Sequence, residues 1–364
     1  MTNYINSIQK ISITIAANAT SATATVSAPT GTYFLIYSGQ STTDTAQTAD
    51  DQCYGRIELT NSTTITAYRG VTSTTNSVTI NANLIDATSN LINSVQSGTI
   101  TIGAAATSNT ASISAVTNAN TAIAYLGSTS TNGGITGQNT ACMVSLSGTT
   151  VTAQRAASTN TATAGYIVIE FQGAALNSAT QPFNISYATL ASTTQTITSV
   201  NVNNTMLIFG GAIAVATWPS RVFQKGVLTN ATTITVSHGT AIAAQKNYCV
   251  TVVEFAGGVL NSNAQRSTFP VAATGGVTQT ITSVNPTYSI CNFLGASNAQ
   301  AAAPLAMALY PYLALTNATT ITATVDLATS TTTPSYEIIE FPAFVSFSPA
   351  WAVRSSLSFA GSPH

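Results

Sequence analysis

One short segment recurs through this chain. LTNATTIT occurs at 228–235 and again, letter for letter, at 315–322, with a near copy at 59–66 and a shorter one, LSGTTVT, at 146–152. The leading leucines are separated by 87, 82 and 87 residues. A period of this length exceeds the roughly 20–50 residues of a solenoid turn and matches a small β-domain. The chain is therefore built from four copies of one unit.

Two further markers share this period. The first is an apolar run that ends in glycine, and its four copies end at Gly39, Gly127, Gly210 and Gly295. The second is an apolar run that ends in Glu-Phe, with the copies YIVIEF, CVTVVEF and YEIIEF. It places Glu170, Glu254 and Glu340 at equivalent positions of three units. The first unit has SVTINANLI at 77–85 in its place, so it is the divergent copy.

The pattern within a unit indicates strands. GTITIGAAATSNTASISAV at 98–116 alternates apolar and polar residues on both sides of a polar centre, which predicts a hairpin with one buried face. The glycine-terminated run is continuously apolar and predicts a central strand buried on both faces. In LTNATTIT we expect a hairpin corner, because Asn tolerates positive φ and bonds to its own backbone. Asn61, Asn230 and Asn317 take this position, and Gly148 serves in the second copy.

These patterns predict an all-β fold of four tandem small antiparallel β-sandwich (Ig-like) domains with little or no helix. The expected domains are residues 1–90, the divergent copy, then 91–175, 176–262 and 263–341, followed by an aromatic-rich C-terminal arm at 342–364. The patterns leave open whether each repeat closes its own core or exchanges strands with its neighbour.

Composition narrows the class of protein. Charged residues make up 5% of the chain, against roughly 25% in a typical soluble domain. The net charge of −1 and scattered Lys and Arg provide no nucleic-acid footprint. No apolar run reaches the roughly 18 residues of a spanning helix, and the first 20 residues lack the apolar core of a secretion signal. We therefore expect neither nucleic-acid binding nor membrane insertion, and no export by the general secretory route.

No catalytic motif is present, so the chemistry-bearing residues are interpreted as structural. A Glu repeated in three units is typical of a duplicated structural residue that caps a strand end or meets a neighbouring domain; the alternative is the paired carboxylates of a glycan hydrolase. His238 is expected in a surface loop. We expect no cofactor and no metal site. A cation at Asp44, Asp50 and Asp51 remains an alternative to a solvated loop.

The four cysteines are far apart in the chain and have no nearby His, which favours buried apolar thiols over disulfides or metal ligands. They are Cys53, Cys142, Cys249 and Cys291. The arm at 342–364 carries anchor-type aromatic residues, which suits either a partner-binding segment or a final edge strand over the fourth domain. The candidate interface residues are Phe344, Phe347, Trp351 and Phe359.

Units of the form SVQSGTITIGAAATSNTASISAV, AIAYLG, VSLSGTTVTAQR and GYIVIEF resemble repeats in structural proteins of tailed bacteriophages, most clearly over residues 93–171. The resemblance implies a virion component that is made in the bacterial cytoplasm and assembled onto the particle. Its implied partners are other virion proteins and copies of itself, with a host-surface glycan or receptor as a further partner.

The expected function is thus a non-enzymatic virion structural protein that acts through protein–protein interfaces, as an exposed capsid decoration or fibre-like homo-oligomer. The alternatives are a tail fibre or tail-tip host-binding protein, a bacterial surface adhesin or S-layer-like protein, and a glycan-active enzyme.

Overall fold

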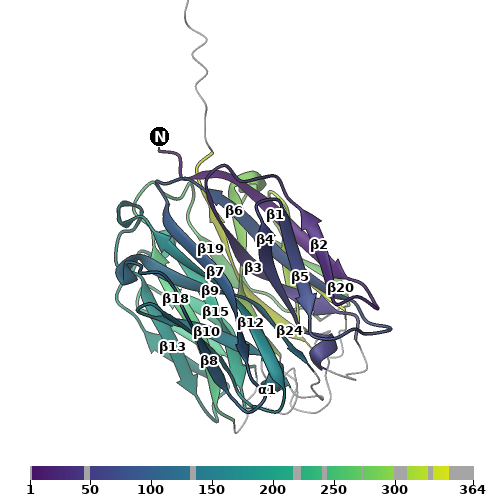
Figure 1. Cartoon of the computed structure of the whole chain (residues 1–364). Helices are drawn as coiled ribbons and strands as arrows, with labels where there is room; N and C mark the ends of the chain where they lie inside the picture. The colour runs from purple at the N-terminus through teal and green to yellow at the C-terminus, as the bar shows by residue number, and fades with distance from the viewer. Residues whose placement is uncertain are drawn as a thin grey trace, which may run out of the picture.

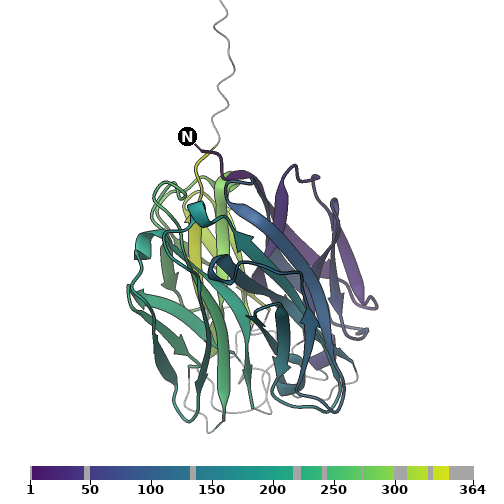
Figure 2. The same ribbon diagram turned by 60° about the vertical axis from the view of Figure 1, so that its left-hand side comes forward.

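The computed structural model describes residues 2–44, 50–131, 137–215, 223–239, 244–272, 274–298, 310–326 and 331–343. Within these ranges the chain forms strands β1 to β24 and one short helix, α1 (Gly137–Thr140), besides single turns of 3₁₀ helix. The strands build four six-stranded antiparallel sheets arranged as a four-bladed β-propeller (Figures 1 and 2). In the described part of the chain no helix has the length and apolar character needed to cross a bilayer.

Each repeat contributes six strands in the same order. The first repeat contains β1 (Ile5–Ile15), β2 (Ser21–Thr25), β3 (Thr32–Thr42), β4 (Gly55–Asn61), β5 (Thr64–Arg69) and β6 (Val78–Ala87). The second contains β7 (Ile92–Ile102), β8 (Ser108–Ser112), β9 (Thr121–Thr131), β10 (Cys142–Ser147), β11 (Thr150–Arg155) and β12 (Thr161–Phe171). The third contains β13 (Gln181–Tyr187), β14 (Ser192–Thr196), β15 (Thr205–Ala214), β16 (Lys225–Asn230), β17 (Thr233–Ser237) and β18 (Lys246–Glu254). The fourth contains β19 (Gln265–Thr268), β20 (Gly275–Thr280), β21 (Ser289–Asn298), β22 (Tyr312–Asn317), β23 (Thr320–Val325) and β24 (Thr332–Glu340).

Every repeat divides its strands between two sheets. The first, sixth and third strands form half of one sheet, and the fourth, fifth and second strands form half of the next. The sheet orders are β2-β5-β4-β9-β12-β7, β13-β18-β15-β10-β11-β8, β14-β17-β16-β21-β24-β19 and β1-β6-β3-β22-β23-β20. The last of these joins the first repeat to the fourth, so the repeats close into a ring.

The prediction of four separate tandem sandwich domains is therefore wrong. Each sheet holds three strands from each of two repeats, so no repeat closes sheets of its own. Period-2 patterning specifies which face of a strand is buried, but it carries no information about which strand lies at the next edge. The joining strands β10 and β22 carry no charged residue, and β4 and β16 carry only Arg56, Glu58 and Lys225, so little charge opposes pairing between the edges of neighbouring repeats.

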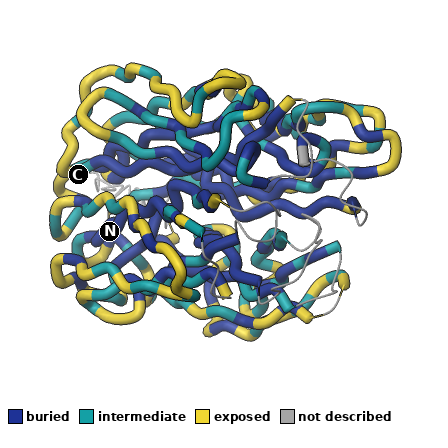
Figure 3. Tube along the Cα trace, turned by 90° about the horizontal axis from the view of Figure 1, so that it is seen from below, coloured by how far each residue is buried: buried dark blue, intermediate teal, exposed yellow. Residues whose placement is uncertain are grey.

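The burial pattern follows from the position of each strand in the ring. The outer strand β1 alternates, with Ile11, Ile13 and Ile15 buried and the intervening Ser12 and Thr14 exposed. The third strands β3, β9, β15 and β21 are buried along nearly their whole length, as the continuous apolar runs predicted. Buried residues fill the middle of the molecule, while exposed residues gather in the turns at its rim (Figure 3). Burial of one Ile or Leu side chain stabilises the fold by about 1.5–3 kcal/mol.

Candidate functional site

Neighbouring repeats meet where the fourth strand of one repeat pairs with the third strand of the next. We call these contacts seams and number them by their repeats: seam 1–2 joins β4 to β9, seam 2–3 joins β10 to β15, seam 3–4 joins β16 to β21, and seam 4–1 joins β22 to β3. The ring is held together at these four places, and the side chains around them differ from one repeat to the next.

A glycine marks each seam. The bridging pairs are Arg56 with Gly127, Met143 with Gly211, Lys225 with Gly295, and Tyr312 with Gly39. All four glycines have φ between 88° and 100°, a region that favours glycine. A Cβ on Gly127 would lie 2.7 Å from the Arg56 Cα, and one on Gly211 would lie 2.8 Å from the Met143 Cα. The neighbouring strands therefore approach each other only because these positions carry no side chain.

The third of these glycines differs from the one expected. We expected Gly210 at the shared position, but the residue with positive φ that bridges Met143 is Gly211. A Cβ on Gly210 would meet the Cys249 Sγ at 2.7 Å. The run MLIFGG has two consecutive glycines, so its pattern does not say which of them takes the bridging position.

Four aromatic rings surround the centre of the ring of repeats. Each stands two residues before a seam glycine: Tyr37, Tyr125, Phe209 and Phe293. Neighbouring rings pack edge to face with centroids 6.0–6.3 Å apart, and the contacts form a closed cycle. Such pairs contribute about 0.5–1.5 kcal/mol each beyond the area that they bury. The aromatic cycle thus couples all four repeats at the axis.

A small cavity of about 30 Å³ adjoins this aromatic cycle. Its wall includes the residues that stand two positions before the bridging residue of each fourth strand: Tyr54, Ala141, Phe223 and Tyr310. Three are aromatic, and the fourth is Ala141, so one ring is missing from this layer. Gln224 is 1% exposed and lines the cavity, where its Oε1 has no hydrogen-bond partner. The volume is large enough for one or two waters, and a water bound there would donate to this oxygen.

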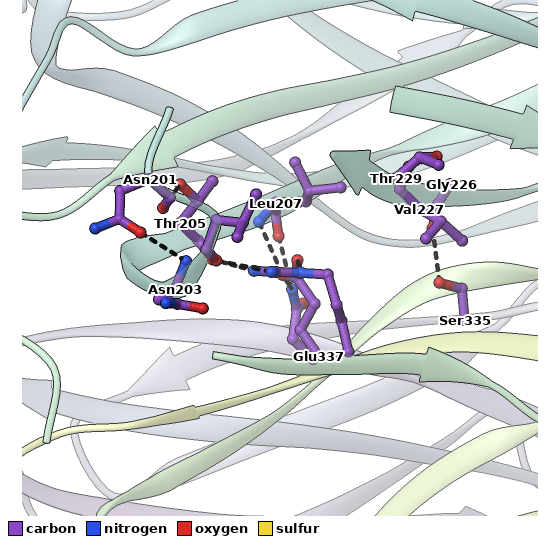
Figure 4. Close-up of polar contacts among 12 residues, drawn as sticks. Asn201, Asn203, Thr205, Leu207, Gly226, Val227, Thr229, Ser335 and Glu337 are labelled. Atoms are coloured by element: carbon purple, nitrogen blue, oxygen red, sulfur yellow. Dashed lines mark hydrogen bonds and ion pairs between the residues drawn. The ribbon is translucent and has the colours of Figure 1, made fainter. Parts of the chain in front are cut away.

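Seam 3–4 carries a buried polar network, shown in Figure 4. Glu337 in β24 accepts hydrogen bonds from the Leu207 backbone N–H at 2.8 Å and from the Arg266 Nε at 3.1 Å. Arg266 also donates to the carbonyls of Val202 at 2.7 Å and Thr205 at 2.6 Å. The fourth repeat therefore holds the entry to β15, in the third repeat, through that strand's own backbone.

Two further side chains belong to the seam 3–4 network. Asn292 donates to the Leu207 carbonyl at 2.6 Å and to Glu337 at 3.2 Å. Ser335 donates to the Gly226 carbonyl at 2.7 Å. Burial raises the pKa of Glu337 despite the opposing effect of the Arg266 charge and the hydrogen bonds. A carboxylate in this position is bonded through both oxygens and serves as a structural acceptor.

Seam 4–1 has a related network made from different residues. Lys10 holds the position of Arg266, because it pairs with Asn83 as Arg266 pairs with Glu337. Lys10 donates to the Ser289 carbonyl. Asn83 donates to the Cys291 carbonyl at 3.1 Å, and Asn81 donates to the Leu313 carbonyl at 3.3 Å. In seam 2–3 a neutral residue takes over, since the Thr180 hydroxyl donates to the Thr121 carbonyl at 2.8 Å.

Seam 1–2 lacks these side chains. Ile167 lies three residues before Glu170, just as Glu337 lies three residues before Glu340. Gly165 corresponds in the same way to Ser335. In the first strand, Ser97 corresponds to Arg266, because these residues pair with Ile167 and Glu337, respectively. A crevice of about 370 Å³ lies here. It is lined by Thr32, Tyr33, Leu59, Thr60, Asn61, Val95, Ser97 and Ile167.

The repeated glutamates bind the loops that lead into the third strands. Glu170 accepts from the Thr117 backbone N–H at 2.7 Å and from the Ser94 hydroxyl at 2.6 Å. Glu254 accepts from the Asn201 N–H at 2.7 Å, and Glu340 from the Asn285 N–H at 2.8 Å. For Glu170, burial favours the neutral acid, but the hydrogen bonds from Ser94 and the loop prevail and lower its pKa.

The first repeat also has this carboxylate, which the sequence interpretation missed. Asp86 accepts from the backbone N–H groups of Thr30 and Gly31, each at 2.8 Å. Its strand ends in LIDA where the other repeats end in an EF pair. The signal was a one-carbon-shorter acid 27 residues after the corner leucine, close to the 24 to 26 residues that separate the leucine from the glutamate in the other repeats.

Three of the four hairpin corners share one local geometry, in which Asn bonds to the backbone two residues on and does not take the positive φ that was considered for it. The Oδ1 of Asn61 accepts from the Thr63 N–H at 2.9 Å, and Asn230 and Asn317 make the same bond to Thr232 and Thr319. The second repeat is one residue shorter at this corner and uses Gly148, with φ of 59°.

The expectation that His238 lies in a surface loop is wrong, since its side chain is 1% exposed. It stands ten residues after the corner leucine of its repeat, where the first repeat has Arg69, and the second repeat has Arg155 at the end of its shorter hairpin. Both arginines are buried and donate to backbone carbonyls: Arg69 to Ala16, Ala19 and Asn76, and Arg155 to Gly103, Ala106 and Asn139. His238 therefore occupies an internal framework position.

The four cysteines are buried and unbridged, and burial raises the pKa of Cys142, Cys249 and Cys291 to about 12. Asp44 accepts from the Cys53 thiol at 3.0 Å. Among the described residues, no group of three or more His, Cys, Asp and Glu side chains is placed to hold a metal ion. Phe344, Phe347, Trp351 and Phe359 lie outside the described residues.

Sequence reasoning also missed the seam 3–4 network. Its signal was present in the third marker, because YEIIEF has Glu337 where YIVIEF has Ile167. A charged residue inside an otherwise apolar copy of a buried strand marks a place with a specific partner.

Comparison with protein-family models, with curated proteins and with solved structures finds no match for this chain.

Proposed function

We propose that this chain is a non-enzymatic structural protein of a bacteriophage virion, an exposed decoration or fibre-like component that acts through its interfaces. One observation carries the non-enzymatic part: the charged side chains at the repeated positions, together with Arg266, are bound into the framework. Four carboxylates accept loop N–H groups, at Asp86, Glu170, Glu254 and Glu340. Three guanidinium groups donate to backbone carbonyls, at Arg69, Arg155 and Arg266.

The surface supports the same proposal. The second strands of the repeats, β2, β8, β14 and β20, are sheet edges made of SATAT, SNTAS, STTQT and GGVTQT, with no charged residue among them. Sheet edges are usually protected by charge or Pro. Uncharged Thr- and Ser-rich edges suit a subunit whose neighbours in a permanent assembly cover them. The virion location rests on the resemblance of the repeats to those of phage structural proteins.

The test is incorporation into particles of the phage that encodes the chain. Mass spectrometry of purified particles is expected to detect this protein in fixed stoichiometry with the major capsid or tail protein. Particles that lack it entirely would overturn the virion assignment.

A truncated variant tests which part of the chain attaches the protein to the particle. A chain that ends at Phe341 keeps the described ring apart from its last two residues, so its thermal unfolding midpoint is expected to match that of the full chain. Loss of the truncated protein from particles assigns anchoring to residues 342–364. Normal incorporation assigns anchoring to the ring and its uncharged edges.

A further inference from the structure

We propose that the crevice at seam 1–2 binds a neutral sugar residue of a surface glycan. The inference rests on the proposed exposed position of the protein, and it names the class of ligand that this position would meet. The crevice has a volume of about 370 Å³, which lies in the lower part of the range of small-molecule sites and suits a mono- or disaccharide.

The crevice exists because seam 1–2 lacks the side chains that bond across the equivalent places. The carbonyl groups of Thr205 and Ser289, at the start of β15 and β21, accept from Arg266 and Lys10. The corresponding residue of β3 is Tyr33, and Ser97, which holds the position of Arg266, lines the same crevice. A short hydroxyl stands where seams 3–4 and 4–1 have a long cation, so the space beside Tyr33 stays open.

A second difference lies in the same seam. Ser335 bonds to the Gly226 carbonyl in seam 3–4, while Gly165 stands opposite the Ile57 carbonyl in seam 1–2. In place of the acidic Glu337, seam 1–2 has the apolar Ile167. Two of the three matched residues, Ser97 and Ile167, line the crevice directly.

The lining has the chemistry of a neutral saccharide site. Hydroxyl and amide groups come from Thr32, Thr60, Asn61 and Ser97, and none of the residues that line the crevice is charged. Thr60, Asn61 and Ser97 are exposed at its rim. Such groups exchange hydrogen bonds with sugar hydroxyls at neutral charge.

The apolar part of the lining fits the other face of a sugar ring. Leu59, Val95 and Ile167 form an aliphatic wall, and Tyr33 is a half-buried aromatic residue beside it. An aromatic ring with a polar tip packs against C–H groups while its hydroxyl stays wet. Because the lining provides no cation, an acidic sugar gains no ion pair there, and the site favours uncharged sugars.

The test uses the purified full chain and saturation-transfer NMR with titration. The probes are glucose, galactose, mannose, N-acetylglucosamine and their common disaccharides, with glucuronic acid as the charged comparator. At least one neutral probe is expected to bind in the millimolar range or tighter, and to bind more tightly than glucuronic acid. Absence of binding by every neutral probe, or equal binding of glucuronic acid, overturns the proposal.

Ser97→Arg is the decisive variant, because it places in the crevice the residue that fills seam 3–4. Sugar binding is expected to weaken by at least about tenfold while the thermal midpoint does not fall. Thr23→Arg adds the same charge on the exposed edge strand β2 and is expected to leave binding unchanged. Undiminished binding by Ser97→Arg, or an equal loss in Thr23→Arg, contradicts the assigned site.

The measurement is independent of virion incorporation. Purified protein that binds sugar but is absent from particles overturns the virion assignment alone. Protein that enters particles but binds none of the neutral probes overturns the sugar site alone.

Discussion

Seam 3–4 and seam 1–2 are made of equivalent strands joined through equivalent glycines, yet they differ in what fills the space beside the joint. In seam 3–4, Arg266, Glu337 and Ser335 bond across to the neighbouring repeat. In seam 1–2 the matching residues are Ser97, Ile167 and Gly165, and a crevice lies there instead. The comparison therefore separates two features of the seams. Backbone geometry at the glycines closes the ring, and side-chain chemistry distinguishes one repeat from another.

The two seams whose buried polar networks contain a charged residue both belong to the fourth repeat. Seam 4–1 pairs Tyr312 with Gly39 and so joins parts of the chain that are far apart in sequence. Joining distant segments costs more loop-closure entropy than joining adjacent ones. Buried polar pairs contribute little net stability, and their best-attested role is to specify register. We infer that the networks around the fourth repeat fix the register in which the ring closes.

The strongest way to break the comparison is to remove the cation of seam 3–4. Arg266→Met keeps much of the aliphatic stem but leaves Glu337, which has 0% exposure, without its charged partner. Breaking a buried pair in this way costs about 3–5 kcal/mol. Urea unfolding of the variant is expected to show a loss of that size.

Ser97→Ala is the matched control, because Ser97 holds the equivalent position in the open seam. It is expected to change the unfolding free energy by less than about 0.5 kcal/mol. A loss of similar size in both variants would show that the two seams do not differ in the way described.

The glycine bridges test the part that the seams share. Gly127→Ala would place a Cβ 2.7 Å from the Arg56 Cα, and Gly295→Ala would place one 3.3 Å from the Lys225 Cα, each at a positive φ. Strain of this kind costs about 1–3 kcal/mol before the overlap is added. Both variants are expected to lose about 2 kcal/mol or more in urea unfolding. A loss confined to one seam would contradict a common closure.

Much of this architecture could be predicted from the sequence, and the missing parts have physical causes. The period and the positions of most strands follow from alternation and from the corner motif, because both reflect local burial and turn geometry. The ring could not be predicted, since edge pairing between repeats depends on one bridge per seam. Two predictions about single residues were wrong, namely the choice of Gly210 instead of Gly211 and the surface position of His238. In both cases the local sequence pattern is compatible with two placements of the residue.

The chemistry of the seams was only partly readable. The departure of Glu337 from the apolar pattern was visible, and it marked a residue with a specific partner. Its partner Arg266 lies 71 residues away in the chain, and no local pattern connects the two. The crevice at seam 1–2 was not readable at all, because it is defined by side chains that are absent in comparison with the other seams.

The pH dependence of stability sharpens the contrast between the seams. Burial raises the folded-state pKa of Glu337 above its ordinary value of 4.5. A group of this kind binds its proton more tightly in the folded state, so its contribution to stability is fully present below pH 4.5 and is lost as the pH rises through the folded pKa. A single proton limits the slope to about 1.4 kcal/mol per pH unit.

Glu337→Gln removes this titration while keeping hydrogen-bonding groups in place. As the pH falls toward 4.5, the wild type is expected to gain unfolding free energy relative to the variant. Urea unfolding at a series of pH values measures the difference. A difference that is flat, or that grows with rising pH, would contradict the raised pKa.

The smallest expected effects come from exchanging one residue between the two seams. Gly165→Ser introduces the hydroxyl that Ser335 provides in seam 3–4, and its Cβ would lie 3.5 Å from the Ile57 carbonyl oxygen. A new hydrogen bond of this kind contributes about 0.5–1.5 kcal/mol, and replacing a strand glycine adds a gain through the unfolded chain. The Cβ would also lie 3.2 Å from the Leu126 Cβ, which must shift slightly and offsets part of the gain. We expect a net increase of about 0.5–1 kcal/mol in the free energy of unfolding, measured with urea.

The reverse exchange, Ser335→Gly, removes the bond to the Gly226 carbonyl and is expected to cost about 1–2 kcal/mol. If the two exchanges change stability in the same direction, the hydroxyl at this position is not what distinguishes the filled seam from the open one.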